Sequence, residues 1–347
     1  MELLKEMYNK GHEEVVFCSD PSSGLKAVIA IHSTVLGPAL GGLRMWNYSS
    51  EEEALYDVLR LSRGMTYKNA AMGLNLGGGK AVIIGDPHKD KSPELFMAFG
   101  RFVESLGGRY ITAEDVGTCE EDMSYIARET SHVVGLAGRS GNPSPVTAYG
   151  VFLGIKAAAE WVFGSDDLKG RKVAVQGLGH VGMELARLLV EAGAHVTATD
   201  IYPDRVKEAR ENFNIKTVGP DEIYEVPCDI FSPCALGAVI NENTVDRLRC
   251  KIVAGAANNQ LKDESFARRL MERGILYAPD YIVNGGGVIN VAEELSGTPY
   301  SIERVFKKLT IIPARLKEVF SCSAAKGVTT AEAADIVTEK RFEKVAV

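Results

Sequence analysis

The hexapeptide GLGHVG at residues 177–182 constrains the fold of this chain more than any other segment. An apolar run at residues 172–176 precedes it, a helical pattern follows it, and a second apolar run from Val196 ends at Asp200. A strand, a glycine turn, a helix and a second strand that ends in an acid form the dinucleotide-binding unit of a doubly wound α/β fold. The sequence therefore predicts a Rossmann domain.

The residues of this hexapeptide have different expected roles. Gly177 permits the tight turn, Gly179 lets a pyrophosphate approach the helix N-terminus, and Gly182 lets the helix pack closely on the strand. His180 and Val181 are also expected to line the cofactor site, with His180 as a solvated turn residue rather than a catalytic group.

Asp200 indicates which dinucleotide is bound. A carboxylate at the end of the second strand accepts hydrogen bonds from ribose hydroxyls and repels a 2′-phosphate, so we expect the cofactor to be NAD. Arg205 follows five residues later and is placed to meet a 2′-phosphate, so weak use of NADP stays open.

Composition limits the class of protein. The chain has 347 residues, 46% hydrophobic and 24% charged, with a net charge of -7. This length predicts about two domains, and the acidic balance argues against nucleic acid or an anionic membrane as a partner. We find no secretory signal and no run of about 20 apolar residues, so we expect a cytoplasmic protein. The six cysteines are expected to be free thiols, and we expect no metal site.

The predicted architecture is two α/β domains separated by a cleft. Residues 135–145, GLAGRSGNPSP, are rich in Gly, Ser and Pro and are the predicted boundary and hinge. We assign residues 1–138 to a substrate-binding, catalytic and oligomerisation domain and residues 139–329 to the Rossmann domain. A C-terminal helix at about 330–347 is expected to pack back on the first domain.

Two lysines in the first half are candidates for catalysis. Lys68 ends a predicted helix, and Lys80 follows three glycines that would let backbone and ligand come close. If the two ammonium groups face each other in a dry site, each lowers the pKa of the other. One lysine then serves as a base while the other holds a carboxylate. The segment does not match a Walker-type phosphate loop, because Ala81 rather than Ser or Thr follows Lys80. The remaining alternative to a catalytic Lys80 is an ordinary solvated lysine.

An acidic pair follows a predicted strand at residues 110–112. Either Glu114 or Asp115 would be well placed there for proton transfer, and we choose Asp115. The alternative for both is a turn or helix-capping acid.

The chain resembles the amino-acid dehydrogenase superfamily of glutamate, leucine, valine and phenylalanine dehydrogenases over essentially its whole length, and its leucine-acting members most. The motifs that carry the resemblance include GPALGGLRMW, MTYKNAAMGLNLGGGKAVIIGDP, GRYITAEDVGT, VAVQGLGHVG, ANNQL and YAPDYIVNGGGVINVAEEL. The resemblance implies reversible oxidative deamination of an L-amino acid to its 2-oxo acid and ammonia, with NAD reduced.

The resemblance also implies residue roles. Lys68, helped by the Gly42 amide, would hold the substrate carboxylate, and Lys80 would activate water for attack on the imine. Asp115 would carry protons to and from the amine. Asn259 would contact the nicotinamide ribose or seat the substrate. Thr147 would bond the nicotinamide carboxamide, and domain closure would expel water. A homo-oligomer, an octamer, is expected.

The expected side-chain pocket is apolar. Leu40 and Val291 occupy the positions where glutamate enzymes have lysine and serine, so a second carboxylate would be buried unpaired. Ala113 and Val288 are expected to complete a pocket for leucine, isoleucine or valine. Asn258 and Gly285 depart from the leucine pattern, so the order of preference stays open.

Three alternatives remain at this point. The first is a phenylalanine- or valine-preferring member of the same family. The second is a non-catalytic NAD-binding sensor, against which the intact Lys68, Lys80 and Asp115 argue. The third is a hydroxy-acid dehydrogenase, which normally needs a His–acid relay, and none of the six His lies in such a motif.

Overall fold

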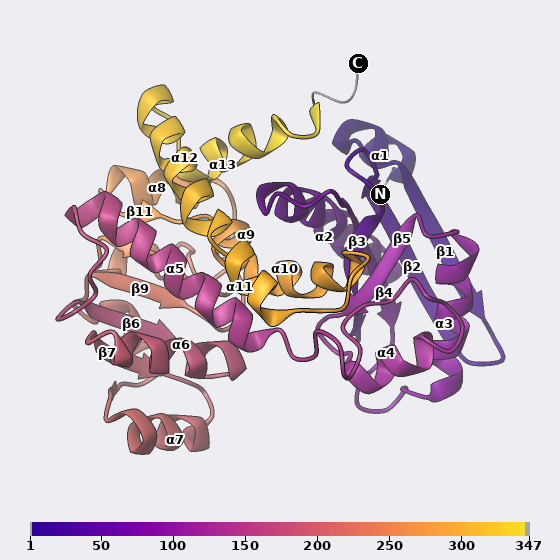
Figure 1. Cartoon of the computed structure of the whole chain (residues 1–347), viewed down its shortest axis with the longest axis horizontal. Helices are drawn as coiled ribbons and strands as arrows, with labels where there is room; N and C mark the ends of the chain where they lie inside the picture. Colours follow the sequence, from indigo (N-terminus) through magenta and orange to yellow (C-terminus); the bar gives the residue numbers. More distant parts are fainter. Residues whose placement is uncertain (1, 344–347) are drawn as a thin grey trace. The chain divides into compact units, whose positions relative to one another are not determined.

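The computed structural model describes residues 2–343 and divides the chain into two compact units. Unit 1 comprises residues 1–142, 290–302 and 339–347, and unit 2 comprises residues 143–289 and 303–338. Figure 1 colours the chain by sequence and labels its elements.

Unit 1 is built on a five-stranded mixed sheet. Its strands are β1 (Glu14–Asp20), β2 (Leu25–Ser33), β3 (Ala39–Trp46), β4 (Gly77–Ile84) and β5 (Tyr110–Glu114). Their order is β1-β2-β4-β3-β5, in which β2 is antiparallel to both neighbours and β3 is parallel to β4 and β5. The helices of this half are α1 (Leu3–Lys10), α2 (Glu51–Ala71), α3 (Pro93–Ser105) and α4 (Glu120–Ile126).

Each face of this sheet has its own apolar core. On one face, Val58 and Leu59 of α2 pack with Val82 of β4. On the other face, side chains of α3 and α4, including Phe99, pack with Tyr110 of β5. Helix α2 begins where the Ser50 hydroxyl accepts a hydrogen bond from the Glu53 amide, and its first turn carries three acids that favour the helix N-terminus.

The glycine run before Lys80 is part of strand β4, where the lack of side chains allows close packing within unit 1. A Cβ atom at Gly78 would lie 2.0 Å from the Thr66 amide of α2, and one at Gly79 would lie 2.7 Å from the Tyr110 ring. These glycines are therefore required because the strand lies against a helix on one face and an aromatic ring on the other.

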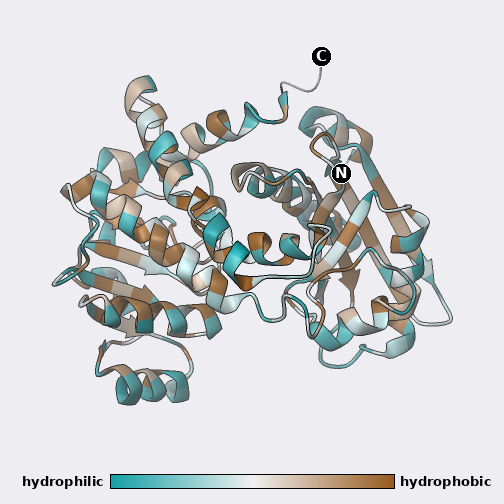
Figure 2. Cartoon of the chain, viewed as in Figure 1, coloured by the Kyte–Doolittle hydropathy of each residue, from teal (hydrophilic) through white to brown (hydrophobic). Residues whose placement is uncertain are grey.

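Unit 2 contains a six-stranded parallel sheet. Its strands are β6 (Lys172–Gln176), β7 (His195–Thr199), β8 (Lys216–Thr217), β9 (Ile230–Pro233), β10 (Ile252–Val253) and β11 (Leu276–Tyr277). Their order, β11-β10-β9-β6-β7-β8, is the doubly wound order of dinucleotide-binding folds, with its switch point between β6 and β9. Figure 2 shows β6 and β9 largely brown, as expected of buried parallel strands, whereas α7 is largely teal.

The remaining helices surround this sheet or connect the two units. The α-helices are α5 (Ser144–Phe163), α6 (His180–Glu191), α7 (Pro203–Phe213), α8 (Ser265–Glu272), α9 (Asp280–Val283), α10 (Gly286–Ala292), α11 (Ile302–Lys308), α12 (Ile311–Lys326) and α13 (Thr330–Glu339). Three short 3₁₀ turns are η1 (Glu222–Glu225), η2 (Val245–Arg247) and η3 (Glu293–Leu295).

Helix α5 is unusually apolar. Within the described chain it is the one helix long and apolar enough, by length and composition, to cross a membrane. Half of its most apolar window is buried, and it packs against α6 and α12. Its apolar character is therefore that of a core helix of unit 2.

The structural units differ from the expected domain boundaries in two places. Residues 290–302 belong to unit 1, where Glu294 accepts hydrogen bonds from the backbone amides of Gly135 and Ser140. Most of α13 belongs to unit 2, because the Thr330 hydroxyl donates to the Tyr277 carbonyl. Of the predicted C-terminal helix, only the part after 338 joins unit 1, and residues 344–347 lie outside the described residues.

Two buried histidines connect the first elements of unit 1. The rings of His12 and His32 meet edge to face, with centroids 4.8 Å apart. His32 Nε2 lies 3.0 Å from the Lys10 carbonyl and Nδ1 lies 2.8 Å from the Thr66 hydroxyl. A neutral ring satisfies both contacts, with Nε2 donating and Nδ1 accepting. Burial, together with the neighbouring His12, lowers the pKa of His32 to about 4.

Acid should therefore destabilise unit 1 through His32. In the unfolded chain this ring takes up a proton below about pH 6.5, whereas in the folded chain it does so only near pH 4. The free energy of unfolding therefore falls as the pH drops through this window, by up to about 3 kcal/mol. His32→Gln removes the titration and should reduce the drop in Tm between pH 7 and pH 4.5. His88→Gln, at an exposed position, is the control. An equal drop in wild type and His32→Gln would contradict this assignment.

Candidate active site

Three neighbouring strands of unit 1 bring the predicted catalytic residues together. The register pairs Arg44 of β3 with Val82 of β4, and Gly42 of β3 with Ala113 of β5. Side chains alternate along a strand, so Lys80 and Val82 share the face that α2 covers. Asp115 follows β5 on this same face, two residues beyond Ala113, and meets Lys80 there.

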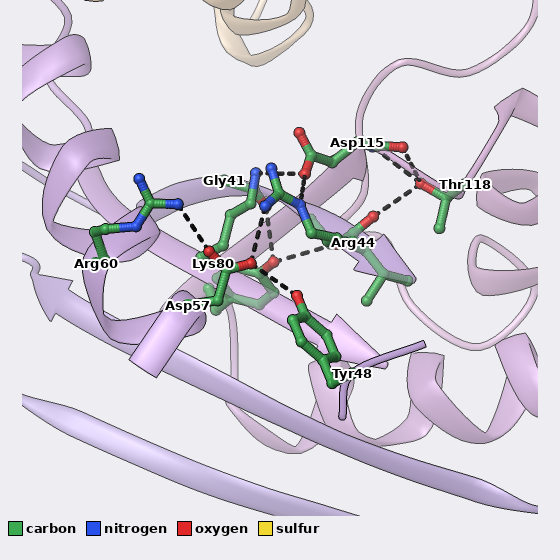
Figure 3. Close-up of polar contacts among 11 residues, drawn as sticks. Gly41, Arg44, Tyr48, Asp57, Arg60, Lys80, Asp115 and Thr118 are labelled. Carbon is green, nitrogen blue, oxygen red and sulfur yellow. Dashed lines mark hydrogen bonds and ion pairs between the residues drawn. The ribbon is translucent and has the colours of Figure 1, made fainter. Parts of the chain in front are cut away.

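Lys80 and Asp115 belong to a chain of alternating charges (Figure 3). Lys80 Nζ and Arg44 Nε each lie 3.0 Å from Asp115 Oδ2. Arg44 also reaches Asp57 Oδ2 of α2 at 2.8 Å, and Arg60 donates to Asp57 Oδ1 at 2.9 Å. The Lys80 side chain is 6% exposed, so these charges interact with little screening by water.

The environment shifts the pKa of both central groups. Burial lowers the pKa of Lys80, and Arg44 lowers it further, while Asp115 acts in the opposite direction. Burial disfavours an ionised Asp115, but Lys80 and Arg44 outweigh that effect and lower the pKa of this carboxyl to about 2. Asp115 is therefore a carboxylate at neutral pH, beside an amine that loses its proton more readily than an ordinary lysine.

The preference for Asp115 over Glu114 has a geometric basis. The two side chains lie on opposite faces of the strand, and Asp115 is the one that contacts Lys80. Burial, with the neighbouring acids Glu120 and Asp115, raises the pKa of Glu114. The Asp115 backbone is held by Thr118, whose hydroxyl oxygen accepts from the Asp115 amide at 2.9 Å and donates to the Leu43 carbonyl at 2.8 Å.

Lys68 is the second lysine that the sequence singles out. It is half-buried in the last turn of α2, as the sequence predicted. The cation that most strongly lowers the pKa of Lys80 is Arg44, which sequence reasoning did not single out. Burial and Arg44 therefore lower the pKa of Lys80, and a mutual effect of Lys68 and Lys80 stays a prediction.

The predicted pocket residues of unit 1 share the face that carries Lys80. Leu40 and Ala113 are buried on neighbouring strands, two positions apart in register. Gly42 pairs with Ala113, and a Cβ atom at Gly42 would be 2.6 Å from the Glu114 carbonyl and 2.9 Å from the Asp115 side chain. Any larger residue at this position would displace Asp115. Val291, partly buried, also belongs to unit 1.

The glycine turn of unit 2 has the geometry that its sequence predicts. Gly177 has a φ of 97°, and a Cβ atom at Gly182 would lie 2.0 Å from the Gly177 carbonyl. A Cβ atom at Gly179 would meet nothing within 4 Å. Gly179 is the N-cap of α6, whose first turn begins with His180 and Val181 and has no side-chain cap. The open N-terminus fits a pyrophosphate.

Asp200 directly follows β7, and its side chain also binds the backbone of the glycine turn. Its Oδ2 accepts from the Leu178 amide at 2.6 Å, and its Oδ1 accepts from the Tyr202 amide at 2.9 Å. Its side chain is 4% exposed, and Arg205 lies 3.7 Å from Oδ2. The carboxylate thus fixes the shape of the turn before any cofactor is considered.

The other predicted residues of unit 2 lie on three segments. Thr147 is in the first turn of α5, where its hydroxyl donates to the Pro143 carbonyl at 3.0 Å. Asn259 is exposed and has a φ of 51°, and its carbonyl accepts from the Ala238 amide at 2.7 Å. Asn258 accepts at 2.8 Å from Asn284. Val288 is buried in α10.

Sequence reasoning missed Arg44, Asp57 and Tyr48. The Tyr48 hydroxyl donates to Asp57 Oδ2 at 2.8 Å and completes the support behind Arg44. A signal for Arg44 existed, because Leu40, Gly42 and Arg44 stand at alternate positions, and such residues share a face when the segment forms a strand. No comparable signal existed for Asp57, whose helix also carries other acids.

Comparison with known proteins identifies the family. Residues 12–132 match the Glu/Leu/Phe/Val dehydrogenase dimerisation domain. Residues 138–201 and 202–346 match the glutamate/leucine/phenylalanine/valine dehydrogenase domain.

Full-length relatives agree with this match. The leucine dehydrogenase of Thermoactinomyces intermedius is 56% identical over 346 residues, which cover 99% of this chain and 94% of that protein. The phenylalanine dehydrogenase of Lysinibacillus sphaericus is 52% identical, with 96% and 89% covered. The structure of L-tryptophan dehydrogenase from Nostoc punctiforme is 45% identical, with a TM-score of 0.87 and 99% of both chains covered. The chain therefore belongs to the glutamate, leucine, phenylalanine and valine dehydrogenase family and is an oxidoreductase of the amino-acid dehydrogenase type.

Proposed function

We propose that this enzyme catalyses the reversible NAD-dependent oxidative deamination of branched-chain L-amino acids, leucine with valine and isoleucine, to 2-oxo acids and ammonia. The observation that carries the proposal is the buried contact of 3.0 Å between Lys80 and Asp115 on the α2-covered face of unit 1. The two groups together provide an amine that loses its proton below the usual lysine range and a carboxylate that stays ionised at neutral pH.

The proposed roles follow from these protonation states. Lys80 acts as the base that removes a proton from water as the water attacks the imino acid. Asp115 moves protons to and from the amine. Lys68 holds the substrate carboxylate with the help of the Gly42 amide. Gly42 lies close to Asp115, since a Cβ atom at Gly42 would be 2.9 Å from the Asp115 side chain.

The residues of unit 2 fit a nicotinamide dinucleotide. The open, uncapped N-terminus of α6 at Gly179 suits its pyrophosphate, and Asp200 suits an adenosine ribose that lacks a 2′-phosphate. We assign further contacts to Gly177, His180, Val181 and Gly182 and, near the nicotinamide, to Thr147 and Asn259. When bound, the cofactor would supply the acceptor for the hydride that leaves the substrate α-carbon.

The apolar residues that we assign to the side-chain pocket support an aliphatic substrate. Leu40 and Ala113 offer no charge to a second carboxylate, so glutamate would be bound at a cost of several kcal/mol. Val288 and Val291 are assigned to the same pocket. The relatives include phenylalanine dehydrogenases at 50–52% identity, so a phenylalanine-preferring enzyme is the alternative, and a valine-preferring one is a second variant of the same proposal.

Assembly and location are part of the proposal. Leu4, Tyr8 and Phe17 are 63–88% exposed on α1 and on β1, an edge strand of the unit 1 sheet. Apolar side chains exposed along an edge support a homo-oligomer, for which we propose an octamer. We place the enzyme in the cytoplasm, with amino acid, oxo acid and ammonia as its small-molecule partners and neither nucleic acid nor membrane.

Lys80→Ala should abolish turnover while leaving NAD affinity nearly unchanged, because the base is lost and the glycine turn is untouched. Steady-state rates and NAD titration followed by protein fluorescence measure the two effects. Lys89→Ala removes an exposed lysine from the same unit and serves as the control. A Lys80→Ala enzyme with normal kcat would remove Lys80 from the mechanism.

Asp200→Ser should reduce the preference for NAD over NADP, measured as the ratio of the two kcat/KM values. The kcat/KM with NAD should also fall, since the serine cannot hold both the Leu178 and Tyr202 amides as the carboxylate does. Asp204→Asn, at an exposed position on the next helix, is the control. An unchanged ratio would mean that another residue distinguishes the two riboses.

The test of the proposal is NADH formation at 340 nm with leucine, isoleucine, valine, methionine, phenylalanine and glutamate. We expect turnover with the branched aliphatic amino acids and none with glutamate. A preference for phenylalanine would retain the reaction and contradict the pocket assignment of Ala113 and Val288. No turnover with any of the six would favour a non-catalytic NAD-binding sensor.

A further inference from the structure

We propose that Arg44 is a positioning residue for this reaction: it holds Asp115 through Oδ2 and so leaves Oδ1 as the oxygen that exchanges protons with the substrate amine. The inference rests on the proposed function, because it assigns one atom of a group that the proposal already uses.

The two oxygens of Asp115 have different surroundings. Both cations, Lys80 and Arg44, contact Oδ2 at 3.0 Å. Within residues 2–343, Oδ1 receives no hydrogen bond from a protein group. This oxygen is also not fully buried, so a ligand can reach it. Figure 3 shows this asymmetry, with dashed lines reaching only one of the carboxylate oxygens. One oxygen is anchored, and the other is available to a ligand.

Arg44 can anchor the carboxylate because it is itself held. Its Nη1 lies 2.8 Å from Asp57 Oδ2, and the Tyr48 hydroxyl donates to that same oxygen. The side chains of Arg44 and Asp57 are 19% and 14% exposed. The planar guanidinium joins Asp57 of α2 to Asp115 after β5 with two of its nitrogens, which a lysine ammonium on a flexible stem cannot do with the same geometry.

Arg44 also affects protonation. Its positive charge lowers the pKa of Lys80 and that of Asp115. Without it, both pKa values rise, so a higher pH is needed before Lys80 can accept a proton. A residue that merely tied β3 to α2 would lower the amount of folded enzyme or its rate, but it would not move the pH dependence.

The experiment compares Arg44→Gln and Arg44→Lys with the wild type. The readouts are kcat, the KM values for leucine and NAD, and the pH profile of kcat/KM for oxidative deamination. Arg44→Gln should lower kcat about 100-fold, leave the KM for NAD within about twofold, and move the ascending limb of the profile to higher pH. Arg44→Lys keeps a positive charge, so its limb should lie nearer to that of the wild type while its kcat stays reduced.

The matched control is Arg109→Gln. Arg109 also lies between two carboxylates of unit 1, Glu13 and Glu14, but it is about half exposed and does not contact Asp115. Its kinetics should equal those of the wild type. Circular dichroism and Tm of each variant establish folding, and Arg44→Lys carries the test if Arg44→Gln does not fold.

The outcomes separate the two proposals. A reduced kcat with an unmoved pH limb in Arg44→Gln, or a wild-type kcat in Arg44→Lys, would overturn the positioning role while leaving Lys80 and Asp115 as proposed. If Lys80→Ala kept the turnover of the wild type, that result would instead overturn the proposed function, and this inference with it.

Discussion

The chemistry proposed for this protein depends on one largely buried arrangement, in which Lys80, Asp115, Arg44 and Asp57 alternate in charge. A lysine buried alone would deprotonate or destabilise the fold, and a carboxylate buried alone would take up a proton. Together they remain ionisable at low solvent exposure. The glycines of β3 and β4 serve this arrangement, because they let the strands and α2 lie close enough for the four side chains to meet.

Much of unit 2 could be predicted because its signals are local. The glycine turn, β6 and Asp200 lie within about thirty residues, and each has a conformational reason that can be read from spacing alone. The contact between Asp200 and the Leu178 amide was not predicted, although both residues were in view. Their hydrogen bond depends on how β7 ends beside β6, which spacing does not specify.

The site in unit 1 was harder to predict, because its contacts join residues that are far apart in the sequence. Lys80 and Asp115 were found through residue type and resemblance, but Arg44 lies 71 residues from Asp115 and 13 from Asp57, and joins them only through strand register and helix packing. The glycine run was expected to let a ligand approach the backbone, but glycine permits close strand packing equally well. The Thr66 and Tyr110 contacts, which reveal the packing use, depend on long-range structure.

The division of the chain into units has a consequence for modularity. The polypeptide passes between the units at 142/143, 289/290, 302/303 and 338/339. Unit 1 includes Glu339 and Arg341, which bind the Tyr67 hydroxyl and the Ala70 carbonyl of α2. No single cut can therefore release either unit whole. During synthesis, the helix that carries Asp57 and Lys68 gains these contacts only when nearly all of the described chain has been made.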